Sequence, residues 1–388
     1  MGSQRHHHRL PREGSHRLLT TSVPVPPGDG ALTRSPRSSL RAPSPCPSPP
    51  PVLPRTPRKS PPDERITPMS QQPQTDPRIH PQIAEILAHI PASDGSAPSV
   101  EGWRGAEESR VPAPAERTPQ LPRVRDAVAA AAHGDVPVRI YTPDEREQRG
   151  VIVYFHGGAF FSGSLDTHDG AARALAAESG LTVVSVGYRR VPEDAFPAGL
   201  EDCYGVLRWT AEHGSEQLGW DGGTLAVAGD SSGGTYAAAV TGMARDDGFE
   251  GITHQVLLYP SVDLDFTEAG TARYPSRTEN ATGYGLETAG LVGHNSFYLD
   301  SGADPADPLV SPIRRDDLSG LPKGLVITAQ FDPLRDEGEA YAARLRQAGV
   351  EATVSRYGSA NHGFMVNFAW IPELYQAFTE VGRFLNQG

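Results

Sequence analysis

From residue 136 to the end of the chain, short apolar runs alternate with longer amphipathic segments. Runs rich in β-branched and aromatic residues predict strands, and apolar positions at a spacing of about 3.6 residues predict helices. The predicted strands are Val136–Thr142, Val151–Phe155, Leu181–Val186, Thr224–Ala228, Val256–Tyr259, Lys323–Ala329 and Ala352–Tyr357. The predicted helices are Asp166–Ser179, Ala198–His213, Ser232–Asp246, Leu334–Ala348 and Leu374–Asn386. This alternation predicts an α/β fold with a mostly parallel central sheet flanked by helices.

Two regions depart from this alternation. Isoleucines and a leucine recur at helical spacing between residues 79 and 90 and predict an amphipathic helix, and a Pro- and Ala-rich stretch follows to about Ala132. Residues 263–322 break the rhythm of strands and helices, and we expect them to pack over the C-terminal edge of the sheet. A single folded domain is expected to span residues 69–388.

Residues 1–68 differ in composition from the rest of the chain. They hold 16 of the 37 prolines and eleven Lys or Arg against four Asp or Glu. Such a segment has little apolar surface to bury, so we expect it to be disordered and without a specific role. Met69 begins the ordinary sequence and is a candidate for the true start of translation. A proline-rich recognition arm or a polybasic tether is the alternative.

Charge and cysteine content exclude several classes of protein. The net charge of −12 is the sum of +7 in residues 1–68 and −19 in residues 69–388, and the acidic larger part disfavours binding to nucleic acid or anionic membranes. No apolar run reaches the roughly 18 residues needed for a membrane span, and the basic N-terminus lacks the apolar core of a signal peptide. Cys46 and Cys203 are the two cysteines, so a cytoplasmic location is expected. We expect no metal and no cofactor.

The most informative motif is Gly229-Asp230-Ser231-Ser232-Gly233-Gly234. It lies between a predicted strand and a predicted helix, which is the context of a nucleophile elbow. In such a turn, glycines flank the serine because the backbone leaves no room for Cβ atoms. This context predicts Ser231 as a nucleophile rather than as a polar turn residue.

A serine hydroxyl needs a base and an acid to orient that base. In an α/β hydrolase they follow the serine in the order acid, then histidine. Asp332 follows the predicted strand 323–329, and His362 lies in the loop after strand 352–357. Taken alone, Asp332 resembles a helix N-cap and His362 a loop residue, but their order and their positions at strand ends predict the triad Ser231, Asp332 and His362. Asp336 and Glu337 compete with Asp332, yet they should lie inside the next helix.

The strand Val151–Phe155 runs into His156-Gly157-Gly158-Ala159-Phe160. A glycine pair allows backbone amides to approach a substrate oxygen closely. We therefore expect an oxyanion hole from the amides of Gly157, Gly158, Ala159 and Ser232. His156 precedes Ser231 in the chain, which is the wrong order for the base, so we interpret it as a hydrogen-bonding residue that shapes the loop.

These motifs resemble those of the hormone-sensitive lipase group of esterases, bacterial lipase family IV. The resemblance covers about residues 76–386 and rests on five motifs in order: residues 156–160, 188–198, 229–234, 332–338 and 362–364. Ala159 stands where the family has a third glycine, and Ser232 where it has alanine. Both positions act through backbone N–H groups, so the oxyanion hole should survive, while the preference among substrates is in doubt.

The resemblance implies an α/β-hydrolase fold with a helical cap built from about residues 76–130 and 263–322. It also implies cofactor-free hydrolysis of short- to medium-chain acyl esters, with small-molecule substrates and frequent homodimers. An amidase or lactonase using the same triad is the main alternative. A non-catalytic receptor-like module is disfavoured because His362 is present. A trypsin-like protease is disfavoured by the order of the triad and by the helix after Gly234.

Overall fold

The computed structural model describes residues 76–90, 99–109, 117–144 and 148–387. Within these ranges, eight strands form one sheet in the order β1-β2-β4-β3-β5-β6-β7-β8. β2 pairs antiparallel with both β1 and β4, and the other neighbours pair in parallel. The strands are β1 (Arg123–Ala131), β2 (Gly134–Thr142), β3 (Gln148–Phe155), β4 (Thr182–Val186), β5 (Trp220–Asp230), β6 (His254–Leu258), β7 (Lys323–Phe331) and β8 (Ala352–Asn361).

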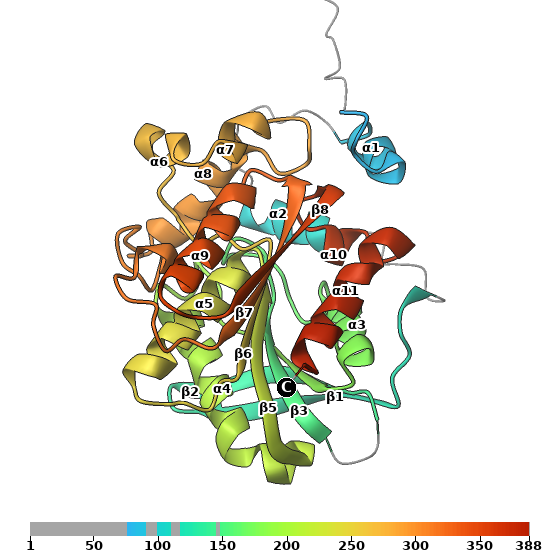
Figure 1. The fold of residues 1–388 in the computed structure, drawn as a ribbon, viewed down its shortest axis with the longest axis vertical. Coiled ribbons are helices and arrows are strands. Elements are labelled where there is room, and N and C mark those ends of the chain that lie inside the picture. The colour runs from blue at the N-terminus through green and yellow to red at the C-terminus, as the bar shows by residue number, and fades with distance from the viewer. Residues whose placement is uncertain (1–75, 91–98, 110–116, 145–147, 388) are drawn as a thin grey trace, which may run out of the picture. The chain divides into compact units, whose positions relative to one another are not determined.

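Helices cover both faces of the sheet (Figure 1). One face packs against α4 (Ala198–Leu218), α5 (Ser232–Asp246) and α9 (Arg335–Gln347), and the other against α3 (Asp169–Ser179), α10 (Phe364–Asn367) and α11 (Pro372–Leu385). β3 explains why both layers are needed. Its Val151, Val153 and Phe155 belong to one core and Ile152 and Tyr154 to the other, and all five are fully buried. The predicted fold class is therefore confirmed.

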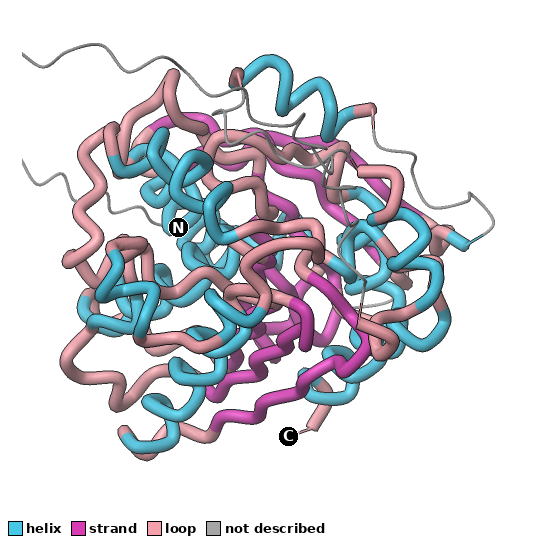
Figure 2. Tube along the Cα trace, turned by 90° about the horizontal axis from the view of Figure 1, so that it is seen from above, coloured by secondary structure: helices cyan, strands magenta, loops and turns pink. Residues whose placement is uncertain are grey.

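Three further helices lie beyond the carboxyl ends of the strands, near the tips of β7 and β8 (Figure 1). They are α6 (Glu268–Ala272), α7 (Ser276–Glu279) and α8 (Thr288–Leu299), and the 3₁₀ turn Pro312–Arg314 follows them. In the view of Figure 2, helices again surround the strands on opposite sides. The segment 263–322 thus departs from the strand–helix alternation, as its sequence pattern indicates.

The N-terminal region differs in part from its prediction. α1 (Pro81–Leu87) lies within the predicted helical segment, but α2 (Val100–Glu108) was not foreseen. Residues 123–131, which we expected in the cap, instead form β1 at the edge of the sheet. β1 is rich in alanine, which has a low strand propensity, and its pairing with β2 overrides that weak local preference. The predictions for residues 1–68 lie outside the described residues.

No helix in the described part of the chain is long and apolar enough to cross a bilayer.

Candidate active site

Ser231 stands on a sharp turn between β5 and α5. Its backbone has φ 55° and ψ −121°, a conformation that non-glycine residues rarely adopt, and its N–H donates to Leu258 O at 2.9 Å. A Cβ on Gly229 would overlap the carbonyl of Gly233, and a Cβ on Gly233 would overlap the carbonyl of Phe155. The turn therefore requires glycine at both positions, which explains why Gly229 and Gly233 flank the serine in the sequence motif.

The three predicted triad residues meet at the carboxyl ends of β5, β7 and β8. His362 Nε2 lies 3.0 Å from Ser231 Oγ, and His362 Nδ1 lies 2.8 Å from Asp332 Oδ2. Asp332 is completely buried, whereas His362 remains partly accessible. The ring of Tyr259 contacts the imidazole edge to face, with centroids 5.2 Å apart. The imidazole can thus take a proton from the hydroxyl while the carboxylate holds its tautomer.

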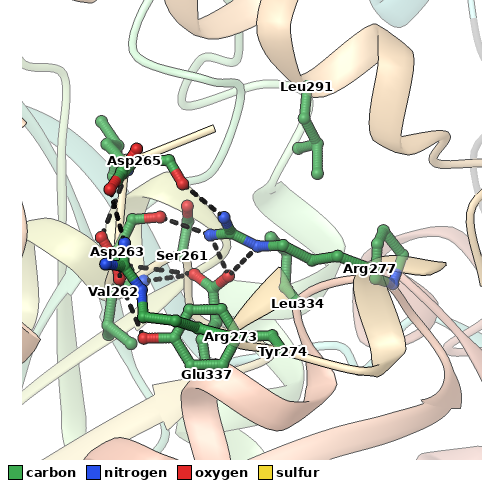
Figure 3. A network of polar contacts seen from close by, with 12 residues as sticks. Ser261, Val262, Asp263, Asp265, Arg273, Tyr274, Arg277, Leu291, Leu334 and Glu337 are labelled. Atoms are coloured by element: carbon green, nitrogen blue, oxygen red, sulfur yellow. Dashed lines mark hydrogen bonds and ion pairs between the residues drawn. The ribbon is translucent and has the colours of Figure 1, made fainter. Parts of the chain in front are cut away.

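Neither competing carboxylate is directed at the imidazole. Asp336 Oδ2 accepts from Ser276 N at 2.8 Å. Glu337 is fully buried and pairs with Arg277, with Nη2 and Oε2 2.5 Å apart (Figure 3). The prediction that the helix would turn these two groups away from His362 is confirmed.

The Arg277–Glu337 pair belongs to a larger polar network that includes residues 262–265 (Figure 3). Glu337 Oε1 accepts from Val262 N at 2.9 Å, and Arg277 also donates to the carbonyls of Asp263 and Asp265. Burial raises the pKa of Glu337 to about 7, and the charge and hydrogen bonds of Arg277 act against that rise. The network ties α7 and residues 262–265 to the start of α9.

The amides of the predicted oxyanion hole divide into two groups. Gly157 N–H donates to Asp230 Oδ1 at 2.9 Å, so it is not free to bind a substrate oxygen, and its inclusion in the hole was wrong. Ala159 and Phe160 have positive φ values of 49° and 67°, and Phe160 N–H donates to Ser232 Oγ at 3.3 Å. Among the described residues, no acceptor binds the N–H groups of Gly158, Ala159 and Ser232, so these three remain the candidate donors.

Asp230 holds this loop and is a residue that the sequence reasoning missed. Besides Gly157 N–H, its Oδ1 accepts from Tyr154 OH at 2.6 Å, and His168 Nε2 lies 3.5 Å from Oδ2. Burial acts to raise the pKa of Asp230, but the neighbouring His168 and the Tyr154 hydroxyl outweigh it and the pKa is lowered. The sequence motif could have indicated this residue, because Asp230 directly precedes Ser231 in it. It is a positioning residue rather than a group that touches substrate.

His156 supports the same loop from its other side. It is buried, its Nδ1 lies 2.8 Å from Gly157 O and 3.1 Å from Tyr188 OH, and its ring stacks on Tyr188. Burial, with a contribution from His168, lowers its pKa to about 3, so the imidazole is neutral. The interpretation of His156 as a hydrogen-bonding residue that shapes the loop is confirmed.

A small pocket of about 40 Å³ opens beside Ser231 and His362. Ala159 and Ser232 line it together with residues 261, 286, 291, 294, 295 and 334, so α8 and the loop before it form one of its walls. A larger hollow of about 950 Å³ lies between β1 and the end of α4, and none of the three triad residues lines it. Among the described residues, no cluster of three or more His, Cys, Asp or Glu side chains could hold a metal ion.

Comparison with known proteins identifies the family of this chain. Residues 152–366 match the family model of the alpha/beta hydrolase fold. The chain is 38% identical to carboxylesterase NlhH of Mycobacterium tuberculosis over 300 residues, which is 76% of this chain and 91% of that protein. It is also 38% identical to an arylesterase of Saccharolobus solfataricus over 232 residues, covering 60% and 73% of the two chains. The structure of the Pyrobaculum calidifontis esterase superposes with a TM-score of 0.71 at 37% identity, covering 79% of this chain and 98% of that one.

Fold, motifs and relatives define an α/β hydrolase that acts on carboxylic esters. Within that class, the chain belongs to the hormone-sensitive lipase family of esterases, bacterial lipase family IV.

Proposed function

We propose that this protein is a serine carboxylesterase that cleaves short- to medium-chain acyl esters through an acyl-enzyme intermediate. The observation that carries the proposal is the position of His362, whose two ring nitrogens lie 3.0 Å from Ser231 Oγ and 2.8 Å from Asp332 Oδ2. Both contacts are within hydrogen-bonding distance, as proton transfer requires. The narrow pocket beside Ser231 favours the shorter acyl groups.

In this mechanism, His362 removes the proton of Ser231 as the hydroxyl oxygen attacks the ester carbonyl. Asp332 stabilises the imidazolium that forms, and the amides of Gly158, Ala159 and Ser232 donate to the oxyanion. The imidazolium then protonates the leaving alkoxide. His362 next takes a proton from water, whose oxygen attacks the acyl-enzyme, and the acid is released as the proton returns to Ser231.

The residues outside the triad maintain this arrangement. Asp230 and His156 hold the loop that presents the oxyanion donors, and segments 262–265 and 276–280 brace the loop that carries Asp332. We propose that residues 263–322, together with α1 and α2, act as the cap over the pocket.

Replacing Ser231 with alanine tests the assignment of the nucleophile. We expect kcat to fall by about 10⁴- to 10⁶-fold, because the remaining groups provide only binding and oxyanion stabilisation. Initial rates on p-nitrophenyl esters of increasing chain length measure this loss and the preference for short chains. Ser232→Ala keeps the backbone amide at the neighbouring position and serves as the control, with activity within about tenfold of the parent protein. A loss below tenfold in S231A, in a preparation free of host esterase, would refute the assignment.

Matched amide and lactone substrates test the alternative chemistries that the same triad supports. Amide cleavage requires protonation of a much poorer leaving group than an alkoxide. We expect kcat/KM to be highest for the ester, and a higher value for the amide or the lactone would replace the esterase proposal.

A further inference from the structure

The pocket beside Ser231 has walls of two kinds. Apart from the predicted triad and the oxyanion donors, six side chains line it. Three are leucines and three carry hydrogen-bonding groups: Leu286, Leu291 and Leu334, and Ser261, His294 and Asn295. In a pocket that binds only hydrocarbon groups, three buried polar side chains would lose hydrogen bonds to water and gain none to the ligand. The three polar side chains therefore point to a ligand that carries a polar group.

Ser261 is the most telling of the three. Its Oγ is buried and has no hydrogen-bond partner among the described residues. Its backbone is fixed, because its N–H donates to Ser231 O at 3.2 Å and its carbonyl accepts from the Thr235 hydroxyl. Ser261 therefore lines the pocket on a fixed backbone, and the hydrogen-bonding capacity of its hydroxyl is unused among the described residues. A buried hydroxyl without a partner costs free energy, and a polar ligand atom in the pocket would offset that cost.

His294 and Asn295 supply polar groups from α8, on another side of the pocket. The His294 ring packs on Trp103, with centroids 4.2 Å apart, and no hydrogen bond joins its ring nitrogens to any described residue. Burial lowers the pKa of His294, so near neutral pH its imidazole offers one donor and one acceptor. The Asn295 side chain is held in place because its Nδ2 donates to Leu291 O at 2.8 Å.

The size of the pocket limits what it can receive. Its volume is about 40 Å³, which leaves room for a small group only. Without movement of its walls, it accepts only a small group at the end of a short chain. A hydroxyl is such a group, and it can both donate and accept hydrogen bonds.

We propose that this pocket selects short esters whose acyl or alcohol portion ends in a hydroxyl, which Ser261, His294 and Asn295 bind. This selection rests on the esterase function proposed above and specifies its class of substrate. Leu286, Leu291 and Leu334 contact the carbon chain, and the three polar groups discriminate against the methyl group that is isosteric with the hydroxyl.

Two isosteric pairs of esters test the proposal and identify which portion enters the pocket. Ethyl 3-hydroxypropanoate against ethyl butanoate tests the acyl side, and 2-hydroxyethyl butanoate against propyl butanoate tests the alcohol side. The kcat/KM ratio of each pair is divided by the ratio of the alkaline hydrolysis rates, which removes intrinsic reactivity. We expect the hydroxylated ester to be preferred by about tenfold in one pair.

Variants locate the origin of that preference. Ser261→Ala, and independently Asn295→Leu, should lower the corrected ratio by about tenfold while kcat/KM for the methyl ester stays the same or rises. Because the two variants alter different walls, a folding failure in one leaves the other as a test. Ser185→Ala is the matched control, since it also deletes a buried, unpartnered serine hydroxyl but lies on β4, outside the pocket lining. This control should leave the ratio unchanged.

The outcomes separate the two proposals. A corrected ratio of one or less in both pairs, or a ratio that neither pocket variant changes, overturns the selection and leaves the esterase function intact. Failure to hydrolyse any of the four esters faster than Ser231→Ala does overturns the esterase function and the selection with it.

Discussion

Asp332 serves two partners with its two carboxylate oxygens. Oδ2 accepts from His362 Nδ1 at 2.8 Å, and Oδ1 accepts from Leu334 N–H at 2.8 Å, at the start of α9. Asp332 thus holds the turn that leads into α9, but the N-cap of that helix is Leu334, so the interpretation of Asp332 as an N-cap is wrong. Because the beginning of the helix holds one oxygen, the other is directed at the imidazole before any substrate binds.

The charge of Asp332 can be removed with little change of shape by Asp332→Asn. We expect kcat to fall by about 10⁴-fold, because an amide in place of the carboxylate favours the wrong imidazole tautomer and no longer stabilises the imidazolium. Asp336→Asn is the matched control, since Asp336 is four residues further on and binds Ser276 and Arg335 instead of His362. Steady-state kinetics on one short-chain ester measures both variants. An equal loss in D336N would contradict the assignment of the acid.

At the scale of elements, α7 and α9 are joined by an ion pair that is inaccessible to solvent. The side chains of Arg277 and Glu337 are both 0% exposed, and the Arg277 guanidinium also lies over the rings of Phe266 and Tyr274. Asn280, directly after α7, donates to Asp332 O at 3.1 Å. Residues 276–280 are therefore coupled to the backbone of Asp332, the predicted acid of the triad.

Arg277→Met leaves Glu337 buried without its cation. We expect the free energy of unfolding to fall by about 3–5 kcal/mol near neutral pH. Without Arg277, the pKa of Glu337 in the folded state rises further above its ordinary value of 4.5. Between pH 4.5 and that raised pKa the folded chain binds a proton that the unfolded chain has lost, so the free energy of unfolding falls as the pH rises. The loss should therefore be larger at pH 8 than at pH 5, as urea unfolding at the two pH values measures.

Arg273→Met is the control for that prediction. Arg273 is 42% exposed and pairs with Asp265 at 2.6 Å and with the buried Asp263 at 3.3 Å. Both carboxylates keep Arg314 as a second partner, so removal of Arg273 should cost only about 0–1 kcal/mol. A loss in R277M no larger than in R273M would show that the buried pair does not hold the two helices together.

For the whole molecule, buried neutral histidines set a limit to acid stability. Burial lowers the pKa of His156 to about 3 and that of His254 to about 4, from an ordinary value of 6.5. Between the lowered pKa of each histidine and its ordinary value of 6.5, the unfolded chain binds protons that the folded chain does not. The stabilisation is therefore complete above pH 6.5 and is lost as the pH falls towards 4.

His254→Gln tests this contribution far from the triad. His254 is buried on β6, with Nδ1 2.7 Å from Thr253 Oγ1. In the variant, the slope of the free energy of unfolding between pH 4 and 6.5 should fall by up to about 1.4 kcal/mol per pH unit, the value for one proton. Urea unfolding across this range measures the slope, and the exposed His213→Gln is the control. An unchanged slope in H254Q would contradict the prediction.

Most of the fold could be predicted because its strands are apolar on both faces and separated by helices. The predicted helix Ser232–Asp246 coincides with α5, and the seven predicted strands correspond to β2–β8. β1 was missed because its alanines have little strand preference and much of it is exposed, so only pairing with β2 makes it a strand. The same limit applies to Gly157. The motif indicates amides near a substrate oxygen, but the motif alone does not show that Asp230 occupies one of them.

By itself, the sequence determined the fold class and the candidate triad. The flanking glycines of Ser231, the order of the motifs and the alternation of elements are local features that the chain carries whatever its environment. The tertiary structure alone decided that Asp230 occupies the amide of Gly157, which carboxylate faces His362, and that Ser261, His294 and Asn295 share one pocket. These depend on side chains far apart in the chain, and packing brings them together in a way that no local pattern encodes.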